Sequence, residues 1–377
     1  MKKTFLTIFL CAVVMTTMAQ KNNYSIVGNN KGSNGVSGRD SVMVIMYNME
    51  NYSQRDTTYV LDGKFQFSGQ TDTDMLVNIY SNDGFRMMLL LQPGSQMAVN
   101  MEPATVTGNR PSEQLNRFAQ GFDEIHSAQQ KVARMLVSTE DQALKDSLDA
   151  VYEDYRQRKK DFVDSIGWTL YEANADNKAG AEILFFIANV APDGVNLYAG
   201  ETTPALKRLL ALYENASPVV RQYDILSRKM KGVIAQMQMR PGVPFRDFEA
   251  IDYATGNTTT LSALIKGHVA VVDFWASWCG PCRKEIDETL KPLHKKYADS
   301  GLVVVGVDVL DDVKKHDQAV KEQDIAYPQL VDTDRDNSAL LYGVQSIPKV
   351  FLFDRSGILI GVFRGEELVR EVEKAMR

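Results

Sequence analysis

The chain has 377 residues, with 42 lysines and arginines against 48 aspartates and glutamates, for a formal net charge of −6. Apolar residues make up 44% and charged residues 24%, which is typical of an ordinary globular protein of two or three domains. The acidic balance gives no general attraction to nucleic acid, and three cysteines with four histidines exclude a disulfide-stapled miniprotein or a Cys/His-rich metal scaffold.

The first 19 residues have the pattern of a secretory signal peptide. Lys2 and Lys3 provide the positive start, residues 5–15 the apolar run, and Thr17-Met18-Ala19 the small-residue cleavage site. After this segment no run approaches the 18 apolar residues of a membrane-spanning helix. The sequence therefore predicts export and a periplasmic location.

Two cysteines remain after the predicted cleavage. Lipid attachment to Cys11 is not expected, because Leu10 occupies the position where such processing needs a small residue, so Cys11 is read as part of the signal peptide. The mature chain then keeps Cys279 and Cys282. In an oxidising compartment such a close pair forms a disulfide unless it is reduced. Because the disulfide would close a very short loop, it would stabilise the fold little. The pair therefore indicates chemistry or metal binding.

Residues 20–110 predict an antiparallel β domain. Short apolar or alternating runs occur at 41–49, 57–60, 64–68, 75–80, 85–91 and 96–100. Turns such as Asp62-Gly63 and Gln92-Pro93-Gly94 separate them. Met43, Met46 and Met49 are three residues apart, so on a strand they alternate between faces, which favours packing over a metal site.

Residues 111–239 predict a helical region. Apolar residues at helical spacing form two stripes: Leu115, Phe118 and Phe122 in the first, and Val151, Tyr155, Phe162 and Ile166 in the second. Thr203-Pro204 and Ser217-Pro218 have the pattern of an N-cap residue followed by proline at the first helical position. This region contains no recognisable catalytic pattern.

Residues 240–377 predict an α/β domain with a mixed central sheet flanked by helices. Strands are expected at 269–275, 302–309, 327–331, 349–353 and 358–363, and helices at 283–297, 312–323 and 366–376. The proline- and glycine-rich segment Arg240–Pro244 marks the start of the domain.

The cysteine pair lies where the first of these strands gives way to a helix. At a helix start, Cys279 would meet unpaired backbone N–H groups that favour the thiolate and lower the thiol pKa from about 8.5 to near 7 or below. Cys282 lies one turn later on the same face and is expected to be the more buried of the two. Cys279 is therefore the candidate nucleophile, and Cys282 would resolve the mixed disulfide.

Two acids near the pair are candidates for proton transfer. Asp273 lies in an apolar strand, where burial should raise its pKa, so that it could take the proton from Cys282. Glu285 follows Cys282 by three residues and is either a second acid at the site or a surface helix residue. Ile347-Pro348 precedes a central strand, and a cis bond there would expose the main chain of Ile347 to a substrate peptide.

The string from Val272 to Cys282, Val-Asp-Phe-Trp-Ala-Ser-Trp-Cys-Gly-Pro-Cys, together with Ile347-Pro348, resembles the thioredoxin superfamily. It is most similar to the exported TlpA- and ResA-like thiol–disulfide oxidoreductases, some of which carry an N-terminal β-rich accessory domain. The resemblance implies catalytic roles for Cys279, Cys282, Asp273 and Glu285, and contact with substrate at Trp278, Gly280, Pro281, Ile347 and Pro348.

Three functions remain open from the sequence. The first is a reductant of protein disulfides, because the Gly-Pro between the cysteines offers no side chain that would hold the thiolate. This function needs a membrane-linked electron donor and no bound cofactor. The second is a disulfide oxidase or isomerase, for which the undetermined oligomeric state matters. The third is a non-enzymatic binding protein with a vestigial Cys-x-x-Cys. In that case a closed zinc site at the pair is not expected, because two ligands are too few.

Overall fold

The structure is a computed structural model that describes residues 22–30, 42–309, 311–332 and 337–377. The predicted signal peptide, 1–19, lies outside these residues. The chain divides into two compact units, one ending at Gln120 and the other beginning at Gly121. No helix in the described ranges combines the length and apolarity needed to cross a membrane.

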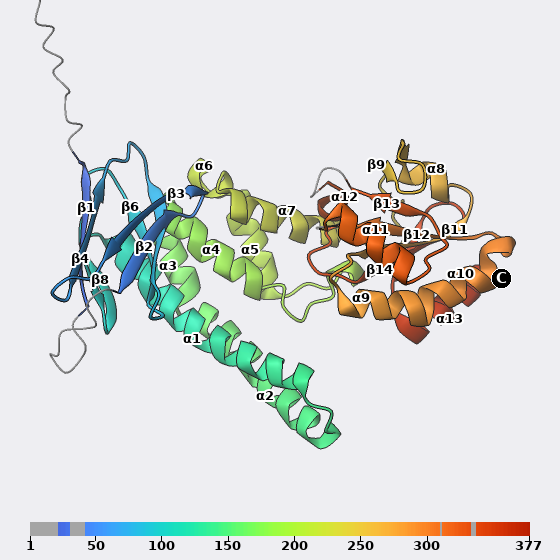
Figure 1. Cartoon of the computed structure of the whole chain (residues 1–377), viewed down its shortest axis with the longest axis horizontal. Helices are drawn as coiled ribbons and strands as arrows, with labels where there is room; N and C mark the ends of the chain where they lie inside the picture. The colour runs from blue at the N-terminus through green and yellow to red at the C-terminus, as the bar shows by residue number, and fades with distance from the viewer. Residues whose placement is uncertain (1–21, 31–41, 310, 333–336) are drawn as a thin grey trace, which may run out of the picture. The chain divides into compact units, whose positions relative to one another are not determined.

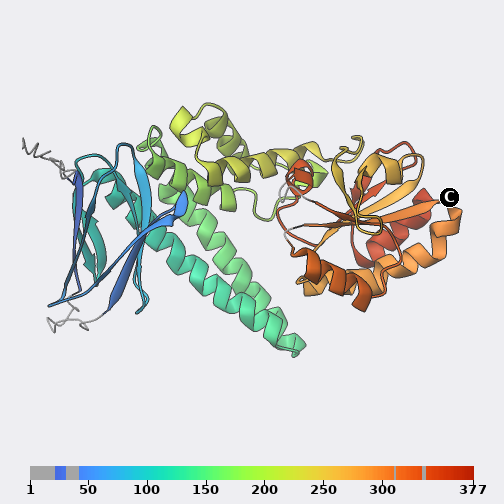
Figure 2. The same ribbon diagram turned by 45° about the horizontal axis from the view of Figure 1, so that its top comes forward.

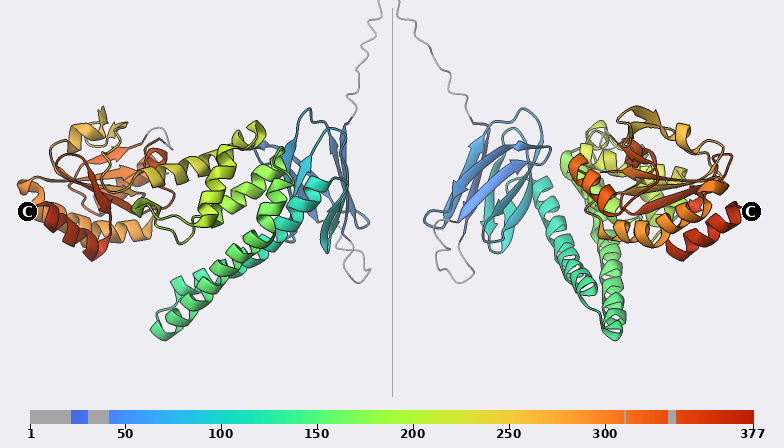
Figure 3. Two further views of the ribbon diagram at one scale, coloured as in Figure 1. Left: turned by 180° about the vertical axis from the view of Figure 1, so that it is seen from behind. Right: turned by 45° about the vertical axis from the view of Figure 1, so that its right-hand side comes forward.

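The N-terminal unit contains two four-stranded sheets, ordered β4-β1-β7-β8 and β3-β2-β5-β6 (Figures 2 and 3). The strands are β1 (Tyr24–Asn29), β2 (Met43–Asn48), β3 (Asn51–Tyr59), β4 (Lys64–Gly69), β5 (Met75–Ser81), β6 (Arg86–Leu91), β7 (Gln96–Met101) and β8 (Ala104–Thr107). Alternate residues of both sheets form one hydrophobic core, which includes Ile26, Val44, Phe67, Ile79 and Leu89.

The expected β domain is confirmed, with one departure from antiparallel pairing. β1 and β7 are parallel neighbours, with Ile26 opposite Met97. The short strand β8 was not predicted, because its four residues form no extended apolar run. Met46 is buried in the core, whereas Met43 on the opposite face is only partly buried.

The helical region begins with two long helices, α1 (Arg110–Ser138) and α2 (Gln142–Phe162). Beyond Gly121 they run antiparallel and side by side, and Gln129 Nε2 donates to the carbonyl of Tyr152 (Figures 2 and 3). The remaining elements are the π-helical turn η1 (Val163–Gly167), α3 (Trp168–Glu172), α4 (Lys178–Val190), the 3₁₀ turn η2 (Leu197–Ala199), α5 (Pro204–Glu214), α6 (Pro218–Arg221) and α7 (Asp224–Gln238).

Both predicted proline starts are confirmed, since Thr203 caps α5 and Ser217 caps α6 through their side chains. Of the two predicted stripes, the first is buried in α1. The second is wrong in part, because Val151 is 41% exposed, while Val163 and Trp168 are buried. The π-helical turn shifts the helical register, so the buried face does not continue at the regular spacing.

The C-terminal region has a seven-stranded mixed sheet in the order β10-β9-β13-β12-β11-β14-β15 (Figure 1). The strands are β9 (Glu249–Asp252), β10 (Thr258–Thr260), β11 (Val269–Trp275), β12 (Leu302–Asp308), β13 (Gln329–Val331), β14 (Lys349–Phe353) and β15 (Leu359–Val362). The helices are α8 (Leu261–Ile265), α9 (Gly280–Glu285), α10 (Lys291–Tyr297), α11 (Val313–Glu322), α12 (Asn337–Leu341) and α13 (Gly365–Ala375). The predicted mixed sheet flanked by helices is confirmed.

The two faces of this sheet have separate hydrophobic cores. Side chains of β11 alternate between them, with Val272 on one face and Val271 on the other. The face of Val271 is covered by α9, α10, α11 and α13, and the face of Val272 by α8 and α12. The core under α8 and α12 also contains Tyr198 and Met239 from the helical region.

The helix that follows the cysteines is continuous from α9 to α10 through the π-helical turn η3 (Ile286–Leu290). The N–H of Lys291 bonds to the carbonyl of Ile286, five residues earlier. Pro292 has no N–H, and its ring would clash with the carbonyl of Glu288 in a regular α-helix. The wider turn accommodates this proline, so the helix continues without a break.

Candidate active site

The two cysteines form a disulfide at the N-terminus of α9. Their Cα atoms are 5.2 Å apart, and the N–H of Cys282 points at Cys279 Sγ, 3.2 Å away. Cys279 is the N-cap residue and Pro281 occupies the first turn. Cys282 is fully buried, while Cys279 retains 4% of its surface. The expected order of burial is therefore present, and a negative charge on Cys279 would lie at the positive end of the helix.

Asp273 lies in the middle of β11 on the face covered by α9 and α13. Its neighbours on this face, Val271 and Trp275, pack in the same cluster as Cys282. Asp273 is fully buried, and neither carboxyl oxygen has a hydrogen-bond partner among the described residues. Burial, reinforced by the nearby charge of Glu285, raises the pKa of Asp273 well above its usual value.

Glu285 is buried at the end of α9 rather than exposed on the helix surface. Its Oε1 accepts from the backbone N–H of Gly365 at 2.7 Å, and Arg364 Nε lies 3.8 Å from Oε2. The charge of Arg364 partly opposes the rise in the pKa of Asp273. The structure thus brings together the two acids that the sequence singled out, along with an arginine that no local pattern indicated.

The loop between β11 and Cys279 is held by an aspartate that the sequence analysis did not identify. The carboxylate of Asp311 accepts from both the backbone N–H and the hydroxyl of Ser277. Asp308, at the end of β12, is buried, and its pKa is raised to about 8, first by burial and then by the charges of Asp311 and Asp332. These residues are far from the cysteines in sequence, so only the parallel pairing of β11 with β12 brings them close.

Behind the loop, Trp275 is fully buried and donates through Nε1 to Gln329 Oε1 at 3.0 Å. The ring of His316 lies 5.3 Å from that of Trp275 and is also buried. No motif in the sequence indicated a role for this histidine. Burial lowers its pKa, so the neutral ring packs beside the indole at this end of the sheet.

The predicted substrate-contact residues lie on two segments. Trp278 is 60% exposed, next to the cysteines, whereas Pro348 is buried. The Ile347–Pro348 peptide bond is cis, as expected. The side chain of Ile347 is partly buried and packs against the hydrophobic cluster that includes both cysteines. Gly280 has open space where a side chain would project.

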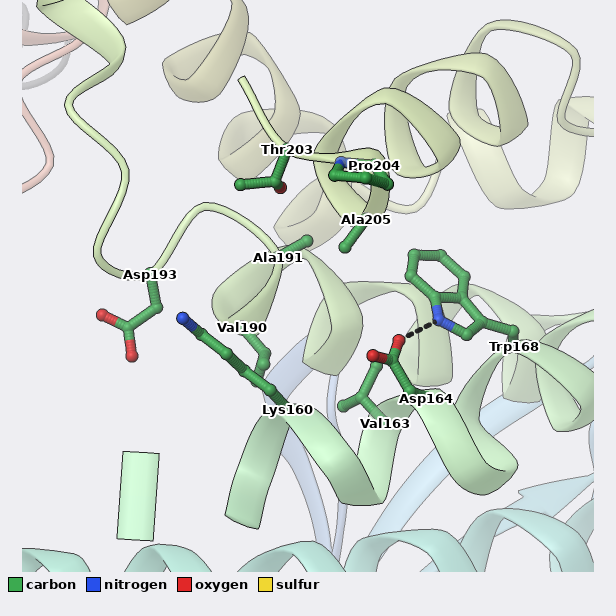
Figure 4. Close-up of a pocket in the computed structure, with 10 residues that line it drawn as sticks. All are labelled: Lys160, Val163, Asp164, Trp168, Val190, Ala191, Asp193, Thr203, Pro204 and Ala205. Carbon is green, nitrogen blue, oxygen red and sulfur yellow. Dashed lines mark hydrogen bonds between the residues drawn. The ribbon is translucent and has the colours of Figure 1, made fainter. Parts of the chain in front are cut away.

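A separate pocket of about 240 Å³ lies in the helical region (Figure 4). It is lined by Lys160, Val163, Asp164, Trp168, Val190, Ala191, Asp193, Thr203, Pro204 and Ala205. Trp168 donates to Asp164 across one wall at 2.8 Å (Figure 4). None of the predicted site residues lines this pocket, and within the described residues no cluster of three or more His, Cys, Asp or Glu side chains suits a metal ion.

Comparison with known proteins gives separate matches for the N-terminal β domain and for the C-terminal region. Residues 241–362 match the AhpC/TSA family, and residues 24–115 match a domain of unknown function, DUF4369. The chain is similar to the thiol-disulfide oxidoreductase ResA of Bacillus thuringiensis subsp. konkukian, with 29% identity over 112 residues, covering 30% of this chain and 64% of ResA. It is also similar to the thioredoxin-like protein YneN of Bacillus subtilis, with 32% identity over 114 residues, covering 29% of this chain and 65% of YneN. The chain thus spans somewhat less than two thirds of each of these two relatives.

Solved structures match the C-terminal region over nearly their whole length. The thioredoxin domain of a thiol-disulfide oxidoreductase from Bacteroides vulgatus is 27% identical, with a TM-score of 0.34, and the match covers 36% of this chain and 98% of that one. A thiol:disulfide interchange protein of the thioredoxin family from Chlorobium tepidum is 30% identical, with a TM-score of 0.32, over 37% of this chain and 98% of that one. By the family-model matches, residues 241–362 form a thioredoxin-like domain of the AhpC/TSA family, and a DUF4369 domain precedes it at residues 24–115.

Proposed function

We propose that this chain is an exported thiol–disulfide oxidoreductase that reduces disulfides in proteins through a Cys279–Cys282 cycle. The observation that carries the proposal is the disulfide at the start of α9, on the sheet face where Asp273 is buried. The names of the curated relatives support the same chemistry.

The reaction begins with Cys279 as a thiolate. It attacks one sulfur of a substrate disulfide, and the other substrate sulfur leaves as a thiolate, which gives a mixed disulfide. Cys282 then loses its proton and attacks Cys279 Sγ, releasing the second substrate sulfur. The substrate gains two electrons, and the enzyme is left with the Cys279–Cys282 disulfide that the structure contains.

Asp273 is the proposed acceptor of the Cys282 proton. A carboxylate in water would be too weak a base for a thiol, but burial makes this one more basic by raising its pKa. The negative charge of Glu285 lies nearby and raises the pKa of Asp273 further. The carboxylate of Glu285 is held in place by the backbone N–H of Gly365. In this way Glu285 helps to set the pKa of Asp273.

Two segments are proposed to contact the substrate. Trp278, Gly280 and Pro281 surround Cys279, and the absence of a side chain at Gly280 leaves room for the attacked disulfide. Across from them, Ile347 would pair its main chain with an extended polypeptide, while Pro348 shapes the segment. Main-chain recognition of this kind would accept many sequences.

The reduced dithiol must be restored after each cycle by a two-electron dithiol donor. In the proposed periplasmic setting, where the predicted signal peptide 1–19 directs the chain, a membrane-linked protein would supply these electrons. The Gly-Pro between the cysteines favours a low potential, because neither residue offers a charged or hydrogen-bonding side chain to the thiolate.

Exchange of each cysteine for serine separates the two steps. Cys279→Ser should abolish reduction of insulin disulfides, because the thiol that remains, Cys282, is fully buried and cannot reach the substrate. Cys282→Ser should instead accumulate a covalent enzyme–substrate complex, since the mixed disulfide cannot be resolved. Mass spectrometry of the unreduced reaction, with turnover measured in parallel, distinguishes the two variants.

Wild-type protein alkylated after reduction serves as the negative control, because it presents no free thiol. Normal turnover by Cys279→Ser would contradict the proposed mechanism.

A further inference from the structure

The segment that leads into Pro348 is held by residues from outside the thioredoxin-like domain. Helix α12 ends at Leu341, and Gly343 adopts a left-handed conformation, with φ +67°. The carbonyls at the end of a helix have no intrahelical partner. Here Tyr342 and Gly343 are both buried, so their carbonyl groups need donors from elsewhere.

The helical region supplies those donors. The hydroxyl of Tyr198, on η2, lies 3.0 Å from the carbonyl oxygen of Gly343 and 3.2 Å from that of Tyr342. Gln236, on α7, donates through Nε2 to the same Gly343 oxygen at 2.7 Å. Two side chains of the helical region thus converge on the end of α12.

Further contacts continue along the segment towards Pro348. Lys229, on α7, donates to Gln345 Oε1 at 2.6 Å. Gly232, also on α7, lies close to the side chain of Gln345. A Cβ at position 232 would be 3.2 Å from Gln345 Nε2. A Cβ on Gly343 would lie 2.4 Å from the backbone nitrogen of Gln236, so the backbone at Gly343 packs directly against the backbone of α7.

Tyr198 also contacts the strand on the other side of Pro348. Its ring packs edge-on against Phe351, with centroids 5.5 Å apart, and the ammonium group of Lys349 lies 5.3 Å from the ring centroid. Tyr198 is 8% exposed and belongs to the same hydrophobic core as Phe351. It therefore touches both the segment before Pro348 and the strand after it.

We propose that Tyr198, assisted by Gln236 and Lys229, is a positioning residue that holds the 342–347 segment for extended polypeptide substrates. The inference rests on the proposed function, in which the Ile347 main chain pairs with the substrate. A polypeptide must meet both Cys279 and Ile347, whereas a small disulfide needs only Cys279. The helical region consequently sets affinity for polypeptides and leaves the chemistry at the cysteines unchanged.

Tyr198→Phe in the full chain removes the hydroxyl and keeps the ring. Hydrogen exchange of amides 344–347 should become about fivefold faster, and the KM for insulin should rise by about fivefold. A change of this size corresponds to the loss of one neutral hydrogen bond. The rate with 5,5′-dithiobis(2-nitrobenzoate) and the reduction potential of the cysteines should not change. Tyr213→Phe on α5 is the matched control, and Gln236→Leu, which removes the second donor to Gly343, should act in the same direction.

Each alternative result has a distinct meaning. Equal losses with insulin and the small disulfide would show that Tyr198 only supports the fold, which overturns the inference. Unchanged amide exchange or unchanged insulin KM in both variants overturns it as well. If the wild-type protein reduces neither substrate, both the proposed function and this inference are wrong. If the wild-type protein is active and the variants behave like it, only this inference is wrong.

Discussion

At the scale of single residues, the proposed site contains a carboxyl group, that of Asp273, which is fully buried. Asp273 has no hydrogen-bond partner within the described structure and lies near a second acid, Glu285. Both conditions favour its neutral form, so its pKa is raised in the folded protein. The raised pKa that underlies the proposed proton transfer from Cys282 also makes Asp273 unfavourable for stability once it ionises.

Asp273→Asn should change the pH dependence of stability. A carboxyl whose folded pKa is raised stabilises the fold below its unfolded value, about pH 4, and loses that contribution as the pH rises through the folded pKa. The wild-type free energy of unfolding should therefore fall relative to that of the variant by up to about 1.4 kcal/mol per pH unit across this window. Urea titrations between pH 4 and pH 9 measure the difference.

The exposed substitution Asp299→Asn, on the turn after α10, is the matched control. Parallel stability profiles for wild type and Asp273→Asn would contradict the raised pKa. The variant should also resolve mixed disulfides more slowly, by about tenfold or more, because the proposed proton acceptor is lost.

The residues of this site differ in how far the sequence could predict them. Cys279, Cys282 and Asp273 lie within one short motif, so their proximity follows from a strand and a turn. Asp311 and Arg364 reach the site through strand pairing and the packing of α13, over separations that carry no local pattern. Glu285 could be located on the helix from sequence, but its burial depends on Gly365, 80 residues later.

At the scale of elements, the predicted strands and helices are largely present because their apolar periodicity matches their burial. β11 and β14 are fully or almost fully buried apolar runs and were predicted with their observed bounds. The short elements β9, β10, α8 and α12 were missed, since three to five residues are too few to show a period. Val151 was expected on a buried stripe but is 41% exposed in the middle of α2, and nothing in the local pattern explains this. The π-helical turn η1 follows α2 and shifts the helical register only beyond it.

The helical region contains its own buried acid, which joins two helices. Glu182 of α4 is 2% exposed and accepts from the hydroxyl of Tyr223, the residue before α7, at 2.6 Å. Burial raises the pKa of Glu182 to about 7, and this hydrogen bond partly opposes the rise. The contact therefore contributes most when the carboxyl group is charged.

Tyr223→Phe should destabilise the protein by about 1–3 kcal/mol at pH 8, because a buried carboxylate loses its donor. The loss should be smaller at pH 5, where Glu182 is mainly neutral. Denaturant unfolding at the two pH values measures it, with Tyr213→Phe as the control. An equal loss at both pH values would mean that the hydroxyl acts through packing rather than through the charge.

At the scale of the whole molecule, the thioredoxin-like domain and the helical region share one hydrophobic core through Tyr198 and Met239. Tyr198 and Gly343 are 145 residues apart in sequence, and no motif in the helical region indicated that it would meet the site. The Cys279–Cys282 motif and the family resemblance predicted thiol–disulfide chemistry for the C-terminal region. They could not show that the segment before Pro348 depends on side chains outside it.

The equilibrium reduction potential of the Cys279–Cys282 pair decides whether this protein can act as a reductant of protein disulfides. The full-length mature protein would be equilibrated in thiol–disulfide buffers, and free thiols counted by the mass added on alkylation. A protein reductant predicts a value near that of thioredoxin, about −270 mV. A value near that of strong oxidants, about −120 mV, or a pair that never exchanges with the buffer, would contradict the account.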